Sequence, residues 1–299
     1  MSTPSTHPGS EEITADPLLP ERSDPSLVSL LFKHPSIVWG GALLAIMLVI
    51  ALLGPLFAAD PTALNPINRL KPPSAENWFG TDFLGRDIFA RVIYGARVSL
   101  VVGIAVAVIA VVLGLFTGLI AGYMRAMDAI IMRVMDGLMA IPGILLAIAL
   151  VSLSGATIIT VVVAIVIPEI PRVVRLVRSV VLTVREEPYV EAAIAAGTKL
   201  PLILFRHILP NTIAPLIVQA TYTCGSAMLT EAILGFLGAG IPPEIPSWGN
   251  IMSEGRTYFQ LTPSIIFFPG IALALTVLAV NSVGDGLRDT LDPRIARKM

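Results

Sequence analysis

The side chains that could carry chemistry are few and far apart in this sequence. His7, His34 and His207 have neither a second histidine nor a carboxylate at metal-ligand spacing. Cys224 is the single cysteine, which excludes an intrachain disulfide and a thiolate zinc site. There is no Gly-Lys pair for a phosphate-binding loop, no Gly-x-Ser-x-Gly elbow and no His-Glu-x-x-His helix. We therefore expect no metal, no bound nucleotide and no catalytic centre in this chain.

The segment 169–211 combines helix breakers with small residues. A proline limits the preceding helix, residues 191–196 favour a short helix, and Gly197 ends it. Thr198 is expected to cap a second helix that ends at Pro210. The alanines of the first helix would let another protein surface approach closely, but an ordinary amphipathic connector would have the same composition. The residues alone leave both interpretations open.

Glu231 is the only acid that we expect deep inside an apolar segment. A carboxylate within a membrane is a functional candidate, here as part of an outer gate or docking site, because it must face a cavity or a partner helix. Counted from residue 213, Glu231 lies about 27 Å along its helix, which also suits the far membrane interface. The interface is the favoured interpretation.

The segment 238–263 contains four prolines and cannot continue a helix. We expect it to fold back at the outer membrane face, with Trp248 at the headgroup level and with Glu244 and Glu254 exposed. Together with residues 79–97, it is predicted to form an outer gate and a docking surface for another protein. A segment that only orders two helix ends would have the same pattern, so both interpretations stay open.

These residues belong to a strongly apolar chain. The 299 residues are 55% hydrophobic and 14% charged, with a mean hydropathy of +0.82, whereas soluble domains have about 25% charged residues. The excess is aliphatic, which suits a surface that faces lipid. A net charge of −1 argues against nucleic acid as a partner. The composition therefore predicts an all-α membrane protein that crosses the bilayer several times.

Apolar segments of about 20 residues can each cross a bilayer as one helix. Four such segments are evident, at 37–58, 98–124, 213–237 and 264–284.

The uncharged segment 137–168 differs from these four in its length. As one helix it would be about 48 Å long, which is too long for a single crossing. A turn near 152–157 would divide it into two helices, whose outer ends extend into 130–136 and 169–174, with Glu169 at the interface. The total is six transmembrane helices.

Lysine and arginine set the orientation of these helices. With the N-terminus inside, the cytoplasmic segments hold 14 of these residues and the outer loops hold six, as the positive-inside rule requires. The reversed orientation is the alternative. We therefore predict cytoplasmic tails at 1–36 and 285–299, an extracytoplasmic loop at 59–97, and a five-helix core at 98–284 that contains a cytoplasmic loop at 169–211.

The segment 169–211 resembles the EAA loop of ABC importer permeases. That loop reads Glu-Ala-Ala, three residues, Gly, nine residues, a position that is usually Ile, and then Leu-Pro two positions further on. The matching residues are Glu191, Ala192, Ala193, Gly197, His207, Leu209 and Pro210. His207 departs from the aliphatic residue of the general pattern, and His-Ile-Leu-Pro-Asn is similar to the variant in the dipeptide/oligopeptide branch.

Further segments are similar to the same branch and follow in the expected order. They are 79–87 with 94–97, 234–249, and 284–293, and the resemblance covers about residues 30–295. Several independent motifs make the resemblance more specific than any one of them.

The resemblance implies a type I ABC importer permease fold with six transmembrane helices, in the bacterial inner (cytoplasmic) membrane. The chain would form half of the translocation pathway of an ATP-driven importer of dipeptides, oligopeptides or a similar peptide such as glutathione. Its expected partners are a homologous second permease, two ATP-binding subunits and an extracytoplasmic substrate-binding protein. The ATP-binding subunits would hold ATP and Mg²⁺, so this chain would hold no cofactor and would not be an enzyme. The EAA loop would transmit their closure to the transmembrane helices.

Other functions fit parts of the same pattern. Permeases with these motifs also carry opines or nickel chelates. A secondary transporter is less favoured, because the sequence shows no inverted repeat and no proton-relay acid. A membrane scaffold would use the segment 169–211 for docking only.

Overall fold

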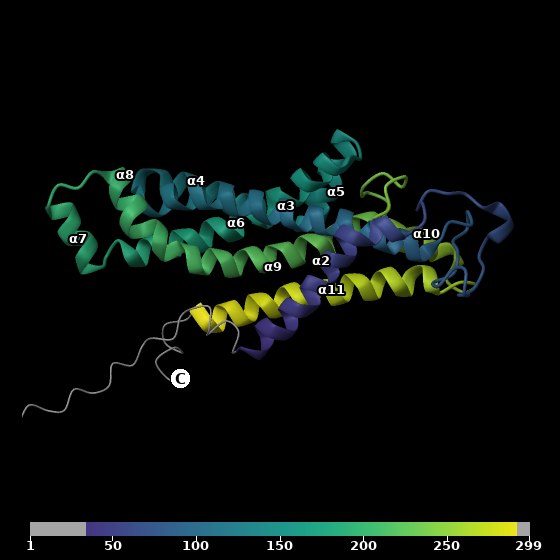
Figure 1. Cartoon of the computed structure of the whole chain (residues 1–299). Coiled ribbons are helices and arrows are strands. Elements are labelled where there is room, and N and C mark those ends of the chain that lie inside the picture. The colour runs from purple at the N-terminus through teal and green to yellow at the C-terminus, as the bar shows by residue number, and fades with distance from the viewer. Residues whose placement is uncertain (1–33, 292–299) are drawn as a thin grey trace, which may run out of the picture.

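The computed structural model describes residues 34–291, which form an elongated bundle of long helices (Figure 1). Within this part of the chain, the regular structure is helical apart from an isolated bridge between Thr81 and Asp87. The expected all-α fold is confirmed. The helices are α2 (Pro35–Phe57), α3 (Ile88–Tyr123), α4 (Arg125–Ala140), α5 (Gly143–Ser154), α6 (Ile158–Val184), α7 (Pro188–Ala195), α8 (Leu200–Ile203), α9 (Leu209–Phe236), α10 (Trp248–Gly255) and α11 (Ser264–Leu291), with 3₁₀ turns at Pro66–Asn68 and Arg256–Tyr258 and a π turn at Leu204–Ile208.

The long helices match the apolar segments of the sequence. In the described residues, four helices are long and apolar enough to cross a membrane: α2, α3, the continuous helix Leu200–Phe236, and α11. The bent pair of α4 and α5 makes a fifth crossing if it is counted as one. α6, with 27 residues, is the sixth long segment, and it carries several charged side chains among its valines and isoleucines. Five of the six expected segments are therefore single helices, and the sixth is the bent pair of α4 and α5.

The helix expected to begin near residue 130 and reach the turn at 152–157 is broken. α4 and α5 meet at an angle of 88° around Ile141 and Pro142. Proline disfavours a helical conformation in the residue before it, and Ile141 is extended (φ −95°, ψ 130°). The expected turn before α6 is present, because α5 ends at Ser154 and Thr157 caps α6 with its side chain.

Two helices are longer than the sequence indicated. α3 begins at Ile88, ten residues before the expected start, because the side chain of Asp87 accepts a hydrogen bond from the amide of Ala90 (3.1 Å) and caps the helix. The expected outer loop 59–97 is shorter by these residues. α6 continues to Val184, so the connection to α9 is shorter than the expected segment 169–211.

Glycines allow α3 and α6 to pack closely. A Cβ atom on Gly114, Gly118 or Gly122 would lie 2.5–2.6 Å from the Cβ atom of a valine on α6. The three valines, Val173, Val177 and Val181, are fully buried. Glycine at every fourth position therefore forms a groove that receives one ridge of α6, as in helix packing within membranes.

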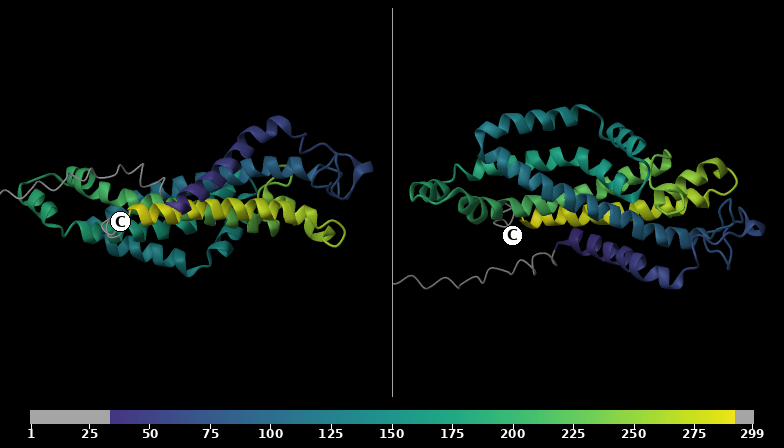
Figure 2. Two further views of the ribbon diagram at one scale, coloured as in Figure 1. Left: turned by 60° about the horizontal axis from the view of Figure 1, so that its bottom comes forward. Right: turned by 90° about the horizontal axis from the view of Figure 1, so that it is seen from above.

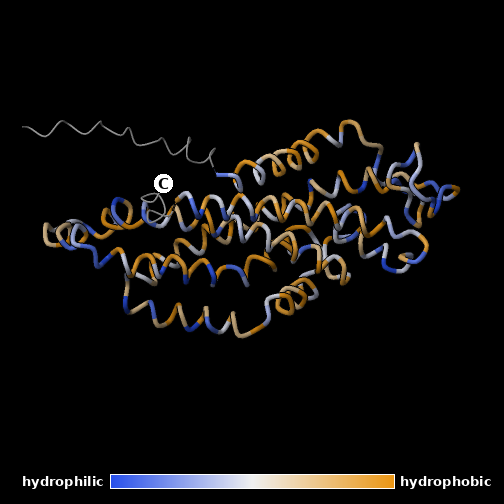
Figure 3. Tube along the Cα trace, turned by 90° about the horizontal axis from the view of Figure 1, so that it is seen from below, coloured by the Kyte–Doolittle hydropathy of each residue, from blue (hydrophilic) through white to orange (hydrophobic). Residues whose placement is uncertain are grey.

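The outer helices present apolar side chains away from the bundle. α2 and α4 lie on opposite sides (Figure 2), and α2 is apolar along its length (Figure 3). Exposed apolar residues include Trp39 on α2 and Leu278 on α11, which are 78% and 58% exposed. An apolar outer surface of this kind suits contact with lipid. Ion pairs between Arg178 and Asp128 (2.5 Å) and between Arg175 and Asp136 (2.7 Å) attach α4 to α6.

Candidate functional site

Two short helices, α7 and α8, project from the end of the bundle that lies opposite α10 (Figure 1). α7 ends in a Schellman motif, in which the amide of Thr198 donates to Ala193 O (3.1 Å) and the amide of Gly197 donates to Ile194 O (2.9 Å). Gly197 has a φ of +77°, a conformation that L side chains rarely adopt. The expected helix break at Gly197 is therefore present. Its cause is the backbone conformation, since the space around a Cβ atom there is open.

The second short helix differs from the expectation at both ends. Lys199, rather than Thr198, is its N-cap residue. α8 continues through the π turn into α9, so Leu200–Phe236 is one helix that does not end at Pro210. Proline inside a helix clashes with the carbonyl four residues before it. The wider π turn directly before Pro210 gives the proline ring room and lets the helix continue.

Apolar and aromatic contacts hold α7 against the bundle. Val190 is fully buried in a cluster with residues of α6, α8 and α9. The ring of Tyr189 lies 5.9 Å from the ring of His207, and its hydroxyl accepts a hydrogen bond from Asn211 Nδ2 (3.2 Å). Asn211 also donates to His207 O (2.7 Å). His207, the departure from the general motif, therefore connects α7 to the start of α9.

The other motif residues form an exposed surface on this loop. Glu191 and Ala192 on α7 are exposed, and Ala193 is half-buried. Leu209 is half-buried against the cluster that contains Val190, and Pro210 is exposed. Some motif residues thus form the exposed face of the loop, and Leu209 helps to attach the loop to the bundle.

Apolar side chains that the sequence analysis did not single out extend this face. Ile194, Leu202 and Phe205 are exposed, and Phe205 has 64% of its surface accessible. Large apolar side chains exposed together on a short loop at the end of the bundle are typical of a protein interface. The exposed apolar positions of a short connector have no distinctive spacing, so only the structure reveals them.

At the opposite end of the bundle, four charged side chains form a cluster. Asp82 Oδ2 accepts hydrogen bonds from Arg86 Nε (2.6 Å) and Arg91 Nη1 (2.7 Å). Glu254 Oε2 lies 2.5 Å from the guanidinium groups of both arginines. Asp82 and Arg91 are almost completely buried. The two acids balance the two bases, which makes the burial of all four groups feasible.

The loop before α3 is shaped to hold Asp82 in this cluster. Its other carboxylate oxygen accepts hydrogen bonds from the amides of Leu84 (2.8 Å) and Arg86 (2.9 Å). Gly85 has a φ of +78°, and a Cβ atom there would lie 1.8 Å from the carbonyl oxygen of Asn65. Only glycine fits this turn. The structure thus brings together residues 79–97 and 238–263, the two segments that the sequence analysis placed at one face.

The expected positions of Glu254 and Trp248 are wrong. The Glu254 side chain is only 15% exposed, because it pairs with Arg86 and Arg91. Trp248 is fully buried and donates a hydrogen bond from Nε1 to Val92 O (3.0 Å), so its ring packs within the protein and does not face lipid headgroups. Glu244 is exposed, as expected.

Glu231 is buried between helices. It has no accessible surface, and its Oε2 atom accepts a hydrogen bond from Ser99 Oγ on α3 (3.1 Å). α3 and α10 pack on α9 and enclose it, and its position at the outer membrane interface stays a prediction.

Comparisons with known proteins agree with these features. The family described as binding-protein-dependent transport system inner membrane component matches residues 110–297, and the N-terminal TM domain of oligopeptide transport permease C matches residues 29–73. A probable peptide ABC transporter permease of Sinorhizobium fredii is 56% identical over 91% of this chain and 94% of its own length. A dipeptide transport system permease of Alkalihalophilus pseudofirmus is 44% identical (88% and 87%), and an oligopeptide transport system permease of Bacillus subtilis is 37% identical (90% and 89%).

The chain belongs to this family of binding-protein-dependent permeases. The family that its motifs resemble is confirmed, and so is the importer permease fold. The permease is a multi-pass membrane protein of a bacterial ABC importer, in which it acts as a transport subunit. The exposed α7–α8 loop and the buried ion-pair cluster are thus features of the two opposite ends of an importer permease.

Proposed function

We propose that this permease forms half of the translocation pathway of an ATP-driven peptide importer in the bacterial inner membrane. The observation that carries the proposal is the similarity, along nearly the whole chain, to permeases named for peptide, dipeptide and oligopeptide transport. Its partners are a homologous second permease, two ATP-binding subunits and an extracytoplasmic binding protein that selects the cargo. ATP and Mg²⁺ are bound by the ATP-binding subunits, which also hydrolyse the ATP.

Uptake by the reconstituted complex tests this function. The permease, its homologous partner and the ATP-binding subunits are placed in proteoliposomes, and the binding protein and a radiolabelled dipeptide are added outside. Uptake should require ATP and should be insensitive to ionophores, because no ion gradient drives it. Ionophore-sensitive uptake without ATP would indicate a secondary transporter, and an assembled complex without any uptake would indicate a scaffold.

The α7–α8 loop is the proposed contact with an ATP-binding subunit. A cleft of that subunit would receive the exposed residues Glu191, Ala192 and Ile194 of α7. The buried Val190 holds the loop against the bundle. Because Tyr189 contacts both His207 and Asn211, a movement of α7 is transmitted to the start of α9. This continuity supports a role in coupling.

Gly197 tests the coupling. In Gly197→Trp the left-handed turn is strained by about 1–2 kcal/mol, so α7 should change its direction. Uptake and transport-linked ATP hydrolysis should both fall, while membrane insertion stays normal. Gly197→Asn is the control, since asparagine tolerates this conformation. Unchanged uptake by Gly197→Trp would show that the loop is not the transmission point.

The charge distribution predicts that both termini are cytoplasmic, with the α7–α8 loop on the same side. Single cysteines at Ser10 and at Ala75, in a Cys224→Ala background, should react with an impermeant maleimide from opposite sides of the membrane. Ser10 lies outside the described residues, and Ala75 is exposed in the loop before α3. Labelling of both cysteines from outside would contradict the proposed orientation.

A further inference from the structure

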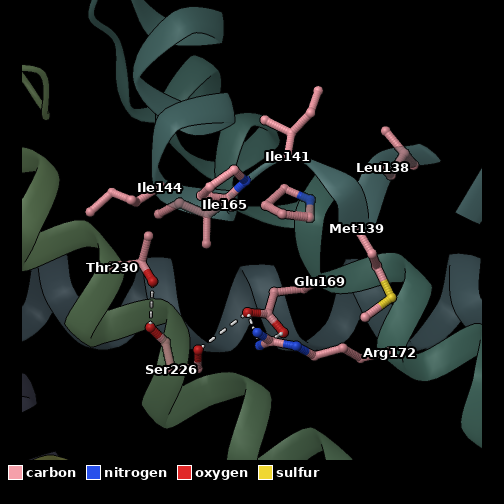
Figure 4. A pocket seen from close by; sticks show the side chains of 12 residues that line it. Leu138, Met139, Ile141, Ile144, Ile165, Glu169, Arg172, Ser226 and Thr230 are labelled. Atoms are coloured by element: carbon pink, nitrogen blue, oxygen red, sulfur yellow. Dashed lines mark hydrogen bonds and ion pairs between the residues drawn. The ribbon is translucent and has the colours of Figure 1, made fainter. Parts of the chain in front are cut away.

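A cavity of about 240 Å³ lies where α4 bends into α5, beside α6 and α9 (Figure 4). Its walls combine apolar side chains, such as Ile144 and Ile165, with a small group of polar ones. The polar group consists of Glu169 and Arg172 from α6 and of hydroxyl-bearing residues from α9. Apolar walls with a few convergent polar groups are typical of small-molecule sites.

Glu169 is the buried charge of this cavity. It is 6% exposed and lies near the middle of α6, about 17 Å from the first residue of that helix. The sequence analysis placed Glu169 where the apolar part of this helix ends, and α6 continues beyond it to Val184. A buried carboxylate is costly unless it has a partner.

Glu169 forms an ion pair with Arg172, which also lines the cavity. Arg172 Nη1 donates to both carboxylate oxygens of Glu169 (2.8 and 3.0 Å), but the Arg172 side chain is 56% exposed. A guanidinium that is already exposed regains water when it leaves the pair, whereas the buried carboxylate needs another partner in its place. Arg172 can therefore be displaced by another cation, whereas the Glu169 carboxylate remains in the wall.

Other groups around the carboxylate suit an incoming cation. Ser226 Oγ donates to Glu169 Oε1 (3.2 Å), and Thr230 lies one helical turn further along α9 (Figure 4). The first residues of α5, Gly143 and Ile144, border the same cavity, so the positive end of a helix dipole faces the cavity that holds the carboxylate.

We propose that this cavity binds the ammonium group of the cargo during its passage, with Glu169 as the binding carboxylate and Arg172 as the counter-ion of the empty state. An ammonium group has three N–H donors, and Glu169, Ser226 and Thr230 offer oxygen atoms to it. The inference rests on the proposed peptide cargo, since every unmodified peptide carries this group at its N-terminus. Recognition of the terminus is independent of side chains, which suits a pathway that must pass different sequences.

The test is equilibrium binding of a radiolabelled dipeptide to the purified permease–ATPase complex without the binding protein. Glu169→Gln keeps the size of the side chain and removes the charge, and should weaken binding on the order of tenfold, as expected when one hydrogen bond to a charged group is lost. The N-acetylated dipeptide, which has no ammonium group, should bind wild type and Glu169→Gln equally. Glu76→Gln, at an exposed position in the loop before α3, is the matched control and should bind like wild type.

Arg172→Gln separates binding from a structural ion pair. If Arg172 competes with the cargo, this variant binds the dipeptide no more weakly than wild type. If the pair only stabilises α6, both variants lose binding and unfold at a lower temperature, which would overturn the inference. Absence of dipeptide binding to the wild-type complex, or equal binding by wild type and Glu169→Gln, would also overturn it. Failure of ATP-dependent uptake by the wild-type proteoliposomes would instead contradict the proposed function.

Discussion

Glu254→Lys is expected to prevent stable folding of the permease. The change removes a carboxylate that pairs with Arg86 and Arg91 and places a third cation beside them. Breaking a buried ion pair by removing one partner costs about 3–5 kcal/mol, because the remaining charge is left without compensation. Arg91 is almost completely buried, so it cannot turn to water. The yield of the assembled complex and its thermal unfolding in detergent would both report this loss.

Glu244→Lys provides the matched control, since it makes the same charge change in the same segment, 238–263, at an exposed position. Its unfolding temperature should equal that of wild type. If Glu244 contributes to docking of the binding protein, more binding protein is needed for half-maximal uptake, and the effect shrinks with salt because surface charges are screened over about 8 Å at physiological ionic strength. Equal stability of the Glu254 and Glu244 variants would show that the ion-pair cluster does not hold α10 in place.

Val190→Asp should disconnect α7 from the bundle. Val190 has no accessible surface and lies among valines of α6 and isoleucines of α8 and the π turn. A carboxylate buried there without a partner costs several kcal/mol, so α7 would leave the cluster instead. The long helices make their own contacts and should still insert. We expect ATP-dependent uptake to be lost and the ATP-binding subunits to co-purify poorly.

Ile194→Asp, on the exposed side of the same helix, distinguishes attachment from docking. It should weaken association with the ATP-binding subunits but leave the unfolding temperature of the permease unchanged. Protease accessibility of the α7–α8 loop should rise only in the Val190 variant. A Val190→Asp permease with normal uptake would show that α7 need not be fixed to the bundle for coupling.

The sequence predicted the features that depend on local residues. Long apolar segments form helices because the aliphatic residues favour burial or lipid, and the six expected segments are all helical. Gly197 ends α7 because its left-handed conformation is a property of the residue itself. The motif around Glu191 also indicated the family, since the spacing of its residues can be read from the sequence without knowledge of the fold.

Local residues were a poor guide to what each polar side chain contacts. Glu244 and Glu254 are two acids in one proline-rich segment, and the sequence treats them alike. Glu254 is paired only because Arg86 in the loop before α3 and Arg91 in the first turn of α3, more than 160 residues earlier in the chain, lie beside it. The ring of Trp248 suits a headgroup layer and a protein core equally well, so the sequence does not distinguish these two positions. In the structure the ring lies in the core, where its Nε1 donates a hydrogen bond to the carbonyl of Val92 on α3.

The same distinction applies to the interior of the bundle. The sequence showed that Glu169 and Glu231 lie close to apolar segments, but their burial depended on which elements pack against α6 and α9. The bend between α4 and α5 creates the cavity at Glu169, and the packing of α3 on α9 encloses Glu231. Helix formation is determined by residues three and four positions apart, and the sequence encodes it directly. Burial of a charge depends on partners that only the tertiary structure brings within hydrogen-bonding distance.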